Sequence, residues 1–194
     1  MKSDAVTLGS GVAATLKAQG PVVALETTIF SELGLPHPHS VRALTDVMAA
    51  VTSRGAVPAL TAVFDGEILC GVDVVDPELI CGPAAKMSAR EIGRAVAQRW
   101  PYGATTVSAA VAIAAAAGVE VFATGGIGGV HRNAAVTGDI SADLGAIASQ
   151  PVVTVTAGAK VFLDLARTVE HLETLGVPIV GWQTDEFPAF HSPT

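Results

Sequence analysis

Lys160 is the residue of this sequence best suited to covalent chemistry. It is one of four lysines, and it stands between the stretches VTVTAGA and VFL. Apolar surroundings lower the pKa of a lysine, and so does a place at the start of a short helix, where the dipole disfavours a cation. A free amine can attack a carbonyl carbon and form a Schiff base. We predict that Lys160 is a nucleophile; the alternative is a lysine that reaches solvent or pairs with a structural carboxylate.

Glu26 is the second candidate, because it ends the apolar run Pro21–Glu26. Partial desolvation raises the pKa of a carboxyl group toward values that suit a general acid. The alternative is a carboxylate that caps the following turn.

Asp139 and Asp143 lie four residues apart around Ser141, a predicted helix N-cap. Carboxylate oxygens of this kind suit a hard divalent cation, and the helix start suits a phosphate. A solvated helix start explains the same pattern, and the spacing alone identifies no metal.

A glycine-rich turn, Gly125–Gly129, precedes His131. It lacks the GxGxxG and Walker patterns, so it does not predict a dinucleotide site or a P-loop. Its backbone N–H groups suit a phosphate, or its glycines let His131 approach a ligand, and a tight buried turn is the alternative. Lys86 and Arg90 flank Ser88 and would suit an anionic sugar phosphate.

These side chains must be positioned by strands and helices that alternate along the chain. Short Val-rich runs bounded by Gly or Pro predict buried strands at Pro21–Glu26, Val57–Phe64, Val119–Ala123, Pro151–Thr156 and Val177–Trp182. Helices are predicted over Ser40–Ser53, from Ser88 with Glu91 in a capping box, and over Ala104–Ala117, Ser141–Ala148 and Thr168–Leu175. The alternation predicts an α/β fold with a largely parallel central sheet, and Asp65-Gly66 adds a hairpin that makes the sheet mixed. Function then collects at the carboxyl ends of the strands.

The composition limits the class of protein. The chain has 194 residues, a formal net charge of −7 and 50% hydrophobic residues, which excludes disorder and argues against a nucleic-acid surface. The run Ala109–Gly118 is too short to cross a bilayer, so we expect no membrane span. Cys70 and Cys81 show no metal or disulfide spacing; we expect small core or near-surface residues in a reducing, cytoplasmic compartment.

Motifs spread over nearly the whole chain resemble those of one family. In order they are VALETTIFSELGLPHP, GAVPALTAVFDG, KMSAREI, GATTVSA, VFATGGIGGVHR, GDISADL, AGAKVFLDL and VEHLETLGVPIVGWQTDEFPAF. Together they resemble the pseudouridine-5′-phosphate glycosidase family, from about Pro21 to Ser192. TGGIGGVHR and DISADL are the most distinctive.

The resemblance implies reversible cleavage of the C–C glycosidic bond of pseudouridine 5′-phosphate to uracil and ribose 5-phosphate, in a homotrimer that needs Mn²⁺. The lysine amine would trap ring-opened ribose as a Schiff base, and the proton donor would serve ring opening and uracil release. By family match, the nucleophile falls on Lys160, the proton donor on Glu26, the manganese ligand on Asp139, a phosphate-proximal histidine on His131, and substrate contacts on Lys86, Val107, Ser141, Ala142 and Asp143.

The sequence also departs from the family pattern. Thr27 stands where the family has serine, Asn133 replaces a glycine, and the family continues well beyond Ser192. We therefore expect a single α/β catalytic domain, 1–194, that lacks the family's C-terminal part. Two alternatives to the glycosidase stay open: a C-ribosylating enzyme of secondary metabolism that uses ribose 5-phosphate, and an inactive sugar-phosphate-binding fragment.

Overall fold

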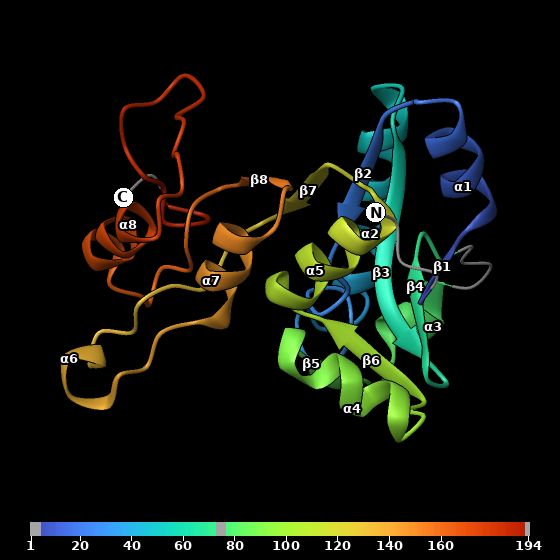
Figure 1. Cartoon of the computed structure of the whole chain (residues 1–194), viewed down its shortest axis with the longest axis horizontal. Coiled ribbons are helices and arrows are strands. Elements are labelled where there is room, and N and C mark those ends of the chain that lie inside the picture. Colours follow the sequence, from blue (N-terminus) through green and yellow to red (C-terminus); the bar gives the residue numbers. More distant parts are fainter. Residues whose placement is uncertain (1–4, 73–76, 193–194) are drawn as a thin grey trace.

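The structure is a computed structural model that describes residues 5–72 and 77–192. Strands and helices alternate along the chain (Figure 1). In order, they are β1 (Val6–Leu8), α1 (Ser10–Lys17), β2 (Val22–Leu25), α2 (His39–Ser53), β3 (Val57–Phe64), β4 (Glu67–Cys70), α3 (Pro77–Cys81), β5 (Ala85–Met87), the 3₁₀ helix η1 (Ala89–Glu91), α4 (Ile92–Ala97), β6 (Tyr102–Thr105), α5 (Val107–Ala117), β7 (Val121–Thr124), α6 (Ala134–Thr137), α7 (Ala142–Ser149), β8 (Val153–Thr156) and α8 (Leu165–Thr174).

The sheet is mixed and mostly parallel, as predicted. Its strands run in the order β1-β4-β3-β2-β7-β8, and β6 pairs with both β3 and β5. β2 pairs in parallel with β3 and β7, and β7 pairs in parallel with β8. The antiparallel pairs are β3 with β4 and β3 with β6. Because β2, β7 and β8 are adjacent and parallel, the loops that follow them leave the sheet at the same edge.

The β3–β4 hairpin turns at Asp65-Gly66, as the sequence predicts. Both residues have positive φ, 49° at Asp65 and 83° at Gly66. An aspartate followed by glycine tolerates this left-handed geometry, which matches the twist of the two strands.

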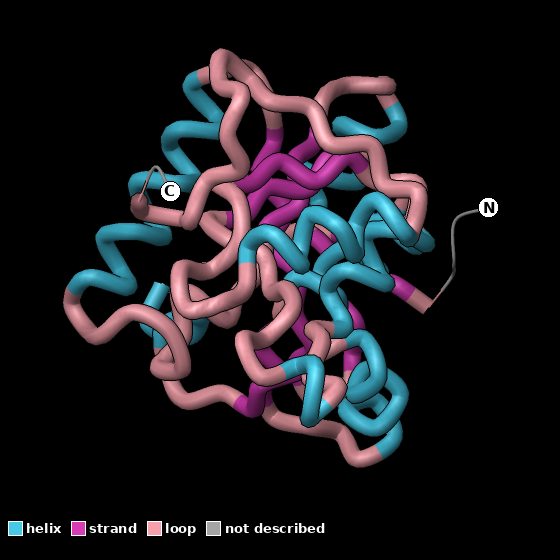
Figure 2. Tube along the Cα trace, turned by 90° about the vertical axis from the view of Figure 1, so that its left-hand side faces the viewer, coloured by secondary structure: helices cyan, strands magenta, loops and turns pink. Residues whose placement is uncertain are grey.

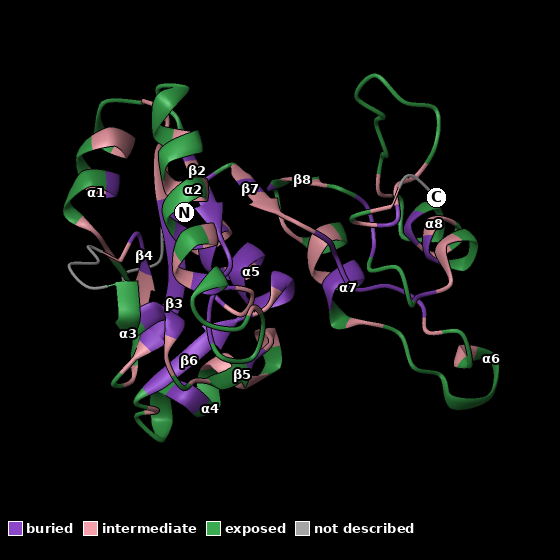
Figure 3. Cartoon of the chain, turned by 180° about the vertical axis from the view of Figure 1, so that it is seen from behind, coloured by how far each residue is buried: buried purple, intermediate pink, exposed green. Residues whose placement is uncertain are grey.

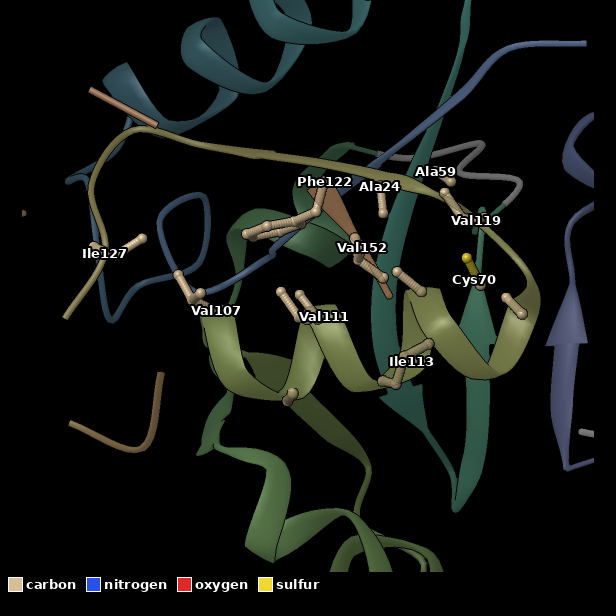
Figure 4. Close-up of a cluster of buried hydrophobic side chains, with 14 of the residues drawn as sticks. Ala24, Ala59, Cys70, Val107, Val111, Ile113, Val119, Phe122, Ile127 and Val152 are labelled. Atoms are coloured by element: carbon tan, nitrogen blue, oxygen red, sulfur yellow. The ribbon is translucent and has the colours of Figure 1, made fainter. Parts of the chain in front are cut away.

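Small residues bring α5 close to the sheet. The helix is buried on most sides and is rich in alanine, with Val107, Val111 and Ile113 as its larger buried side chains. They belong to the main core together with Ala24 of β2 and Phe122 of β7 (Figure 4). Figure 2 shows the strands inside the molecule, with helices and loops around them.

Four predicted elements differ from the structure. The predicted helix Ala104–Ala117 begins only at Val107, because Tyr102–Thr105 pairs with β3 as β6. The last helix begins at Leu165 rather than Thr168, because Asp164 caps it. Lys160 immediately precedes a turn at Val161 and Phe162 instead of starting a helix. The predicted strand Val177–Trp182 is an irregular segment that pairs with no strand of the described chain.

That irregular segment is also exposed. Val180 is 89% and Trp182 is 87% accessible, and Figure 3 shows much of the chain after β8 as exposed. An apolar run forms a strand only where a neighbouring strand can pair with its backbone, and none does so here among the described residues.

Cys70 and Cys81 are free and buried, as expected for small core residues. Among the helices of the described residues, none is both long and apolar enough to cross a bilayer.

Two glycines provide a test of this backbone. Gly55, just after α2, has a φ of 79°, whereas Gly145 lies inside α7, and an added Cβ would meet no atom within 4 Å at either position. Gly55→Ala should lower the free energy of unfolding by about 1–2 kcal/mol, because an L side chain is strained in the left-handed region. Gly145→Ala should raise it by up to about 1 kcal/mol. Urea unfolding measures both, and equal effects would contradict the assigned conformation of Gly55.

Candidate active site

Strand register places Glu26 beside Thr124. Leu25 of β2 pairs with Ala123 of β7, so the next residues along both strands are neighbours at the carboxyl edge. The Thr124 hydroxyl hydrogen-bonds the Glu26 carboxyl oxygen Oε1. Sequence analysis gave Thr124 no role. The signal for its role was the register between two adjacent parallel strands.

The Glu26 carboxyl is desolvated, as predicted. The residue is 8% exposed. Burial raises the pKa of the Glu26 carboxyl from its ordinary value of 4.5 to about 7, although the Thr124 hydrogen bond and the charges of Lys160 and Lys86 lower it. A carboxyl group that titrates near neutral pH can both donate and accept a proton.

Buried threonines hold the backbone beneath Glu26. The Thr27 hydroxyl donates to the Thr61 carbonyl at 2.9 Å, and the Thr105 backbone N–H donates to the Thr27 hydroxyl at 3.0 Å. The ends of β2 and β6 are therefore tied to the middle of β3 by side chains. Sequence reasoning missed this network, because three threonines distant in the sequence give no local pattern.

The backbone of Lys160 is fixed by hydrogen bonds that continue the β7–β8 pairing beyond the strands. The Ile127 N–H donates to the Gly158 carbonyl at 3.0 Å, and the Lys160 N–H donates to the Ile127 carbonyl at 3.1 Å. The glycine-rich turn after β7 and the turn after β8 therefore run side by side. This pairing brings Lys160 close enough for its charge to act on Glu26.

The environment of Lys160 differs from the prediction. The residue is exposed, although apolar residues flank it in the sequence, and its turn has no helix start that would place a dipole against it. The side chains of its neighbours Val161 and Phe162 also face outward, at 42% and 56% exposure. The structure therefore supplies neither the burial nor the helix dipole on which the predicted free amine of Lys160 rested.

Asp143 connects α7, α5 and the glycine-rich turn. It is 5% exposed. Its two carboxyl oxygens accept hydrogen bonds from the backbone N–H groups of Ser108 and Gly128, both at 2.9 Å. Ser108 lies in the first turn of α5, where unpaired N–H groups and the helix dipole favour a carboxylate. Asp143 therefore acts first as an internal anchor, and Ser141 caps α7 by accepting from its N–H at 3.2 Å.

The glycine-rich turn is tightly packed. A Cβ on Gly128 would lie 2.2 Å from the Ser141 hydroxyl oxygen. In the neighbouring turn after β8, a Cβ on Gly158 would lie 1.7 Å from the Pro188 carbonyl oxygen. The Gly128 N–H is already used by Asp143. The interpretation as a tight buried turn therefore accounts for Gly128 without a bound phosphate.

The other predicted substrate contacts lie in different surroundings. Lys86 is exposed on β5, and its charge acts on Glu26. Ala142 is exposed at the start of α7, whereas Val107 is only 1% exposed. Because this fraction covers the whole residue, neither the side chain nor the backbone of Val107 is open to a ligand here. The roles of these residues stay predictions.

His131 and Asp139 form a separate pair. Their Nδ1 and Oδ2 atoms are 3.7 Å apart, and both side chains are partly exposed. Mn²⁺ takes several oxygen ligands, yet the described residues contain no group of three His, Cys, Asp or Glu that could hold a metal ion. The described residues therefore offer no cage of three such protein ligands, and both Asp139 as a manganese ligand and the Mn²⁺ requirement stay predictions.

The fold and site define an α/β protein with a lysine and a protonatable glutamate at the carboxyl edge of its sheet. A family model described as indigoidine synthase A like protein matches residues 11–194. A pseudouridine-5′-phosphate glycosidase of Roseiflexus sp. (strain RS-1) is 47% identical over 199 residues, covering 98% of this chain and 62% of that protein. One of Methylobacterium nodulans is 50% identical over 183 residues, covering 93% and 54%.

Two solved structures are also similar. The prealnumycin C-glycosynthase AlnA, solved in complex with ribulose 5-phosphate, aligns with a TM-score of 0.87 and 38% identity over 97% of this chain and 61% of that one. An indigoidine synthase A-like protein of Thermotoga maritima aligns with a TM-score of 0.78 and 36% identity over 89% and 58%.

The chain belongs to the indigoidine synthase A-like family, which confirms the resemblance seen in its motifs. It spans about 60% of the length of the relatives it matches.

Removing the Asp143 carboxylate should destabilise the protein strongly. Asp143→Ala leaves two buried backbone N–H groups without acceptors, at about 1–3 kcal/mol each. Asp164→Ala is the matched control, since it removes a partly exposed cap that accepts from the Arg167 N–H and pairs with the Arg167 guanidinium, worth about 1 kcal/mol. Urea unfolding compares them, and a smaller loss for Asp143→Ala than for Asp164→Ala would contradict the anchoring role.

Ionisation of Glu26 should make stability depend on pH. Since its pKa rises from 4.5 to about 7 on folding, the folded state retains a proton that the unfolded state releases. The free energy of unfolding should therefore fall between these values, on the order of 3 kcal/mol in all. Glu26→Gln should remove this fall, and Glu32→Gln, at an exposed loop position, should not. Measuring the free energy of unfolding at about pH 5 and about pH 8 tests this prediction. An equal change between the two pH values in wild type and in Glu26→Gln would contradict a buried, titrating Glu26.

Proposed function

We propose that the protein cleaves and forms the C–C glycosidic bond of pseudouridine 5′-phosphate, through a Schiff base between Lys160 and ring-opened ribose 5-phosphate. The observation that supports this most is the convergence of Lys160, Lys86 and Asp143 on the buried carboxyl of Glu26. Similarity to pseudouridine-5′-phosphate glycosidases supports the substrate.

A C–C bond explains why a lysine is needed. Uracil leaves through carbon, so protonation of a leaving heteroatom cannot drive cleavage. A lysine nitrogen that has replaced the ring oxygen at C1′ can push its lone pair into a C1′=N iminium as the C–C bond breaks, and the bond electrons then leave with the uracil carbon, which takes up a proton. In this proposal, the Lys160 amine forms that iminium once the ribose ring has opened.

Glu26 moves the protons of the reaction. Its protonated carboxyl donates to the ring oxygen as the ribose opens, and later to the uracil carbon as uracil leaves. A pKa near 7 supports both roles, because the group is protonated and ionised in comparable amounts at neutral pH. The Thr124 hydroxyl keeps Oε1 in place by its hydrogen bond.

Lys86 holds the anionic end of the substrate. Its exposed ammonium suits a phosphate as a point charge. Binding energy from the phosphate orients the reacting carbon over Lys160. A homotrimeric assembly and a cytoplasmic location belong to the same proposal.

Borohydride trapping tests the Schiff base. With ribose 5-phosphate and borohydride, the wild-type chain should gain one reduced sugar-phosphate adduct, mapped to Lys160 by peptide mass. Lys160→Arg keeps the charge but cannot form an imine, so the adduct should fall at least tenfold. Lys17→Arg, at an exposed position on α1, is the matched control and should react like wild type. An adduct that persists in folded Lys160→Arg would overturn the proposal.

A further inference from the structure

One face of the sheet is partly open at its β8 end. β8 is the last strand of the sheet order and pairs only with β7 among the described strands. Successive residues of a strand point to opposite faces. On one face of β8 the Thr154 hydroxyl oxygen is buried, whereas on the other face Val153 is 65% and Val155 is 55% exposed. Since helices normally cover both faces of a parallel sheet, the open apolar face requires an explanation.

Strand register shows that the open face is the one that α2 covers at β2. Leu25 of β2 belongs to the same buried cluster as Leu44 of α2. Directly paired residues of neighbouring strands point to the same face. Two apolar rows therefore cross β2, β7 and β8 on this face: Val23-Val121-Val153 and Leu25-Ala123-Val155. Leu25 is only 3% exposed, so the cover that α2 provides ends between β2 and β8.

A cavity of about 330 Å³ lies at the edge of that cover. Ala43 and Val47 of α2 line one side of it, and Ala123 of β7 lines it from the sheet. Neighbouring strands lie about 4.8 Å apart and packed helices about 10 Å apart. One helix therefore covers about two strands, and a further helix beside α2 would lie over β7 and β8. Its side chains would fill the cavity and bury the two exposed valines.

Longer relatives point to the source of such a helix. The structure of AlnA aligns with 97% of this chain, so it contains the same sheet, but the match accounts for only 61% of AlnA. The Roseiflexus glycosidase is matched over 62% of its length. The remainder of each relative has no counterpart in residues 1–194.

We propose that the open β7–β8 face binds an amphipathic helix beside α2, and that this helix belongs to a polypeptide homologous to the unmatched part of the relatives. Its apolar side would meet the valine and alanine rows while its polar side faces solvent. Neighbouring exposed apolar residues, unlike single scattered ones, mark interaction sites. The inference does not rest on the proposed function, because no reacting group takes part in it. It assigns a partner whose side chains would contact the cavity wall that Glu26 shares.

Co-expression tests the interface with a defined partner. The unmatched part of the Roseiflexus glycosidase, expressed together with the tagged 194-residue chain, should copurify with it. Val153→Asp should lower the amount of recovered partner at least tenfold, because it buries a charge among apolar side chains. Val136→Asp is the matched control, since Val136 is 90% exposed on α6 and lies outside the open face. It should copurify like wild type.

Cysteine labelling locates the contact. Both native cysteines are buried, so a cysteine introduced at an exposed position should react much faster with a maleimide. The labelling rate of Val155→Cys, followed at that residue by peptide mass, should fall at least tenfold in the complex, whereas the rate of Val136→Cys should not change. Fusing the same partner after residue 194 gives the same comparison if the separate partner does not fold.

Three results would overturn the proposal. The first is no copurification together with no protection of Val155→Cys in the fusion. The second is equal protection of Val155→Cys and Val136→Cys. The third is a dimer of the chain alone that Val153→Asp disrupts in sedimentation, because the occupant of the face would then be a second copy of this chain.

Discussion

The Asp143 carboxylate accepts hydrogen bonds from the backbone N–H groups of Ser108 and Gly128, and both oxygens are used. A buried carboxylate is tolerated only where such donors replace water. This arrangement fixes α7, the start of α5 and the glycine-rich turn relative to one another. Ile127 of the same turn pairs with the backbone of Lys160. The position of the candidate nucleophile therefore depends on a carboxylate that need not touch a ligand.

The candidate site combines opposite solvent environments within one sheet edge. Glu26 is buried beside an apolar cavity, whereas Lys160 and Lys86 are exposed. Burial alone would keep the Glu26 carboxyl neutral well above its ordinary pKa, and the two lysines counter part of that effect. The parallel order of β2, β7 and β8 makes this possible, because each strand delivers its following loop to the same edge.

Sequence periodicity predicted the elements whose burial is uniform. β3 matches its predicted bounds, and the Ser141 cap and the Ser88–Glu91 capping box form as expected. The prediction of a strand over Val177–Trp182 was wrong, because an apolar run does not show whether a partner strand is present. The burial of Lys160 was wrong for a related reason, since apolar sequence neighbours can themselves face solvent. The link between Glu26 and Thr124 depends on register, and the anchoring role of Asp143 depends on tertiary contacts; single-residue patterns contain neither.

The crowding at Gly128 limits how this sequence can diverge. A methyl group there would meet the Ser141 hydroxyl, and Ser141 in turn caps the helix that carries Asp143. A lineage that changes one residue at a time meets a less stable intermediate whichever position changes first. Neutral drift should therefore spread through the exposed helix faces and spare this pair, so that relatives come to share the turn long after their surfaces have ceased to resemble one another.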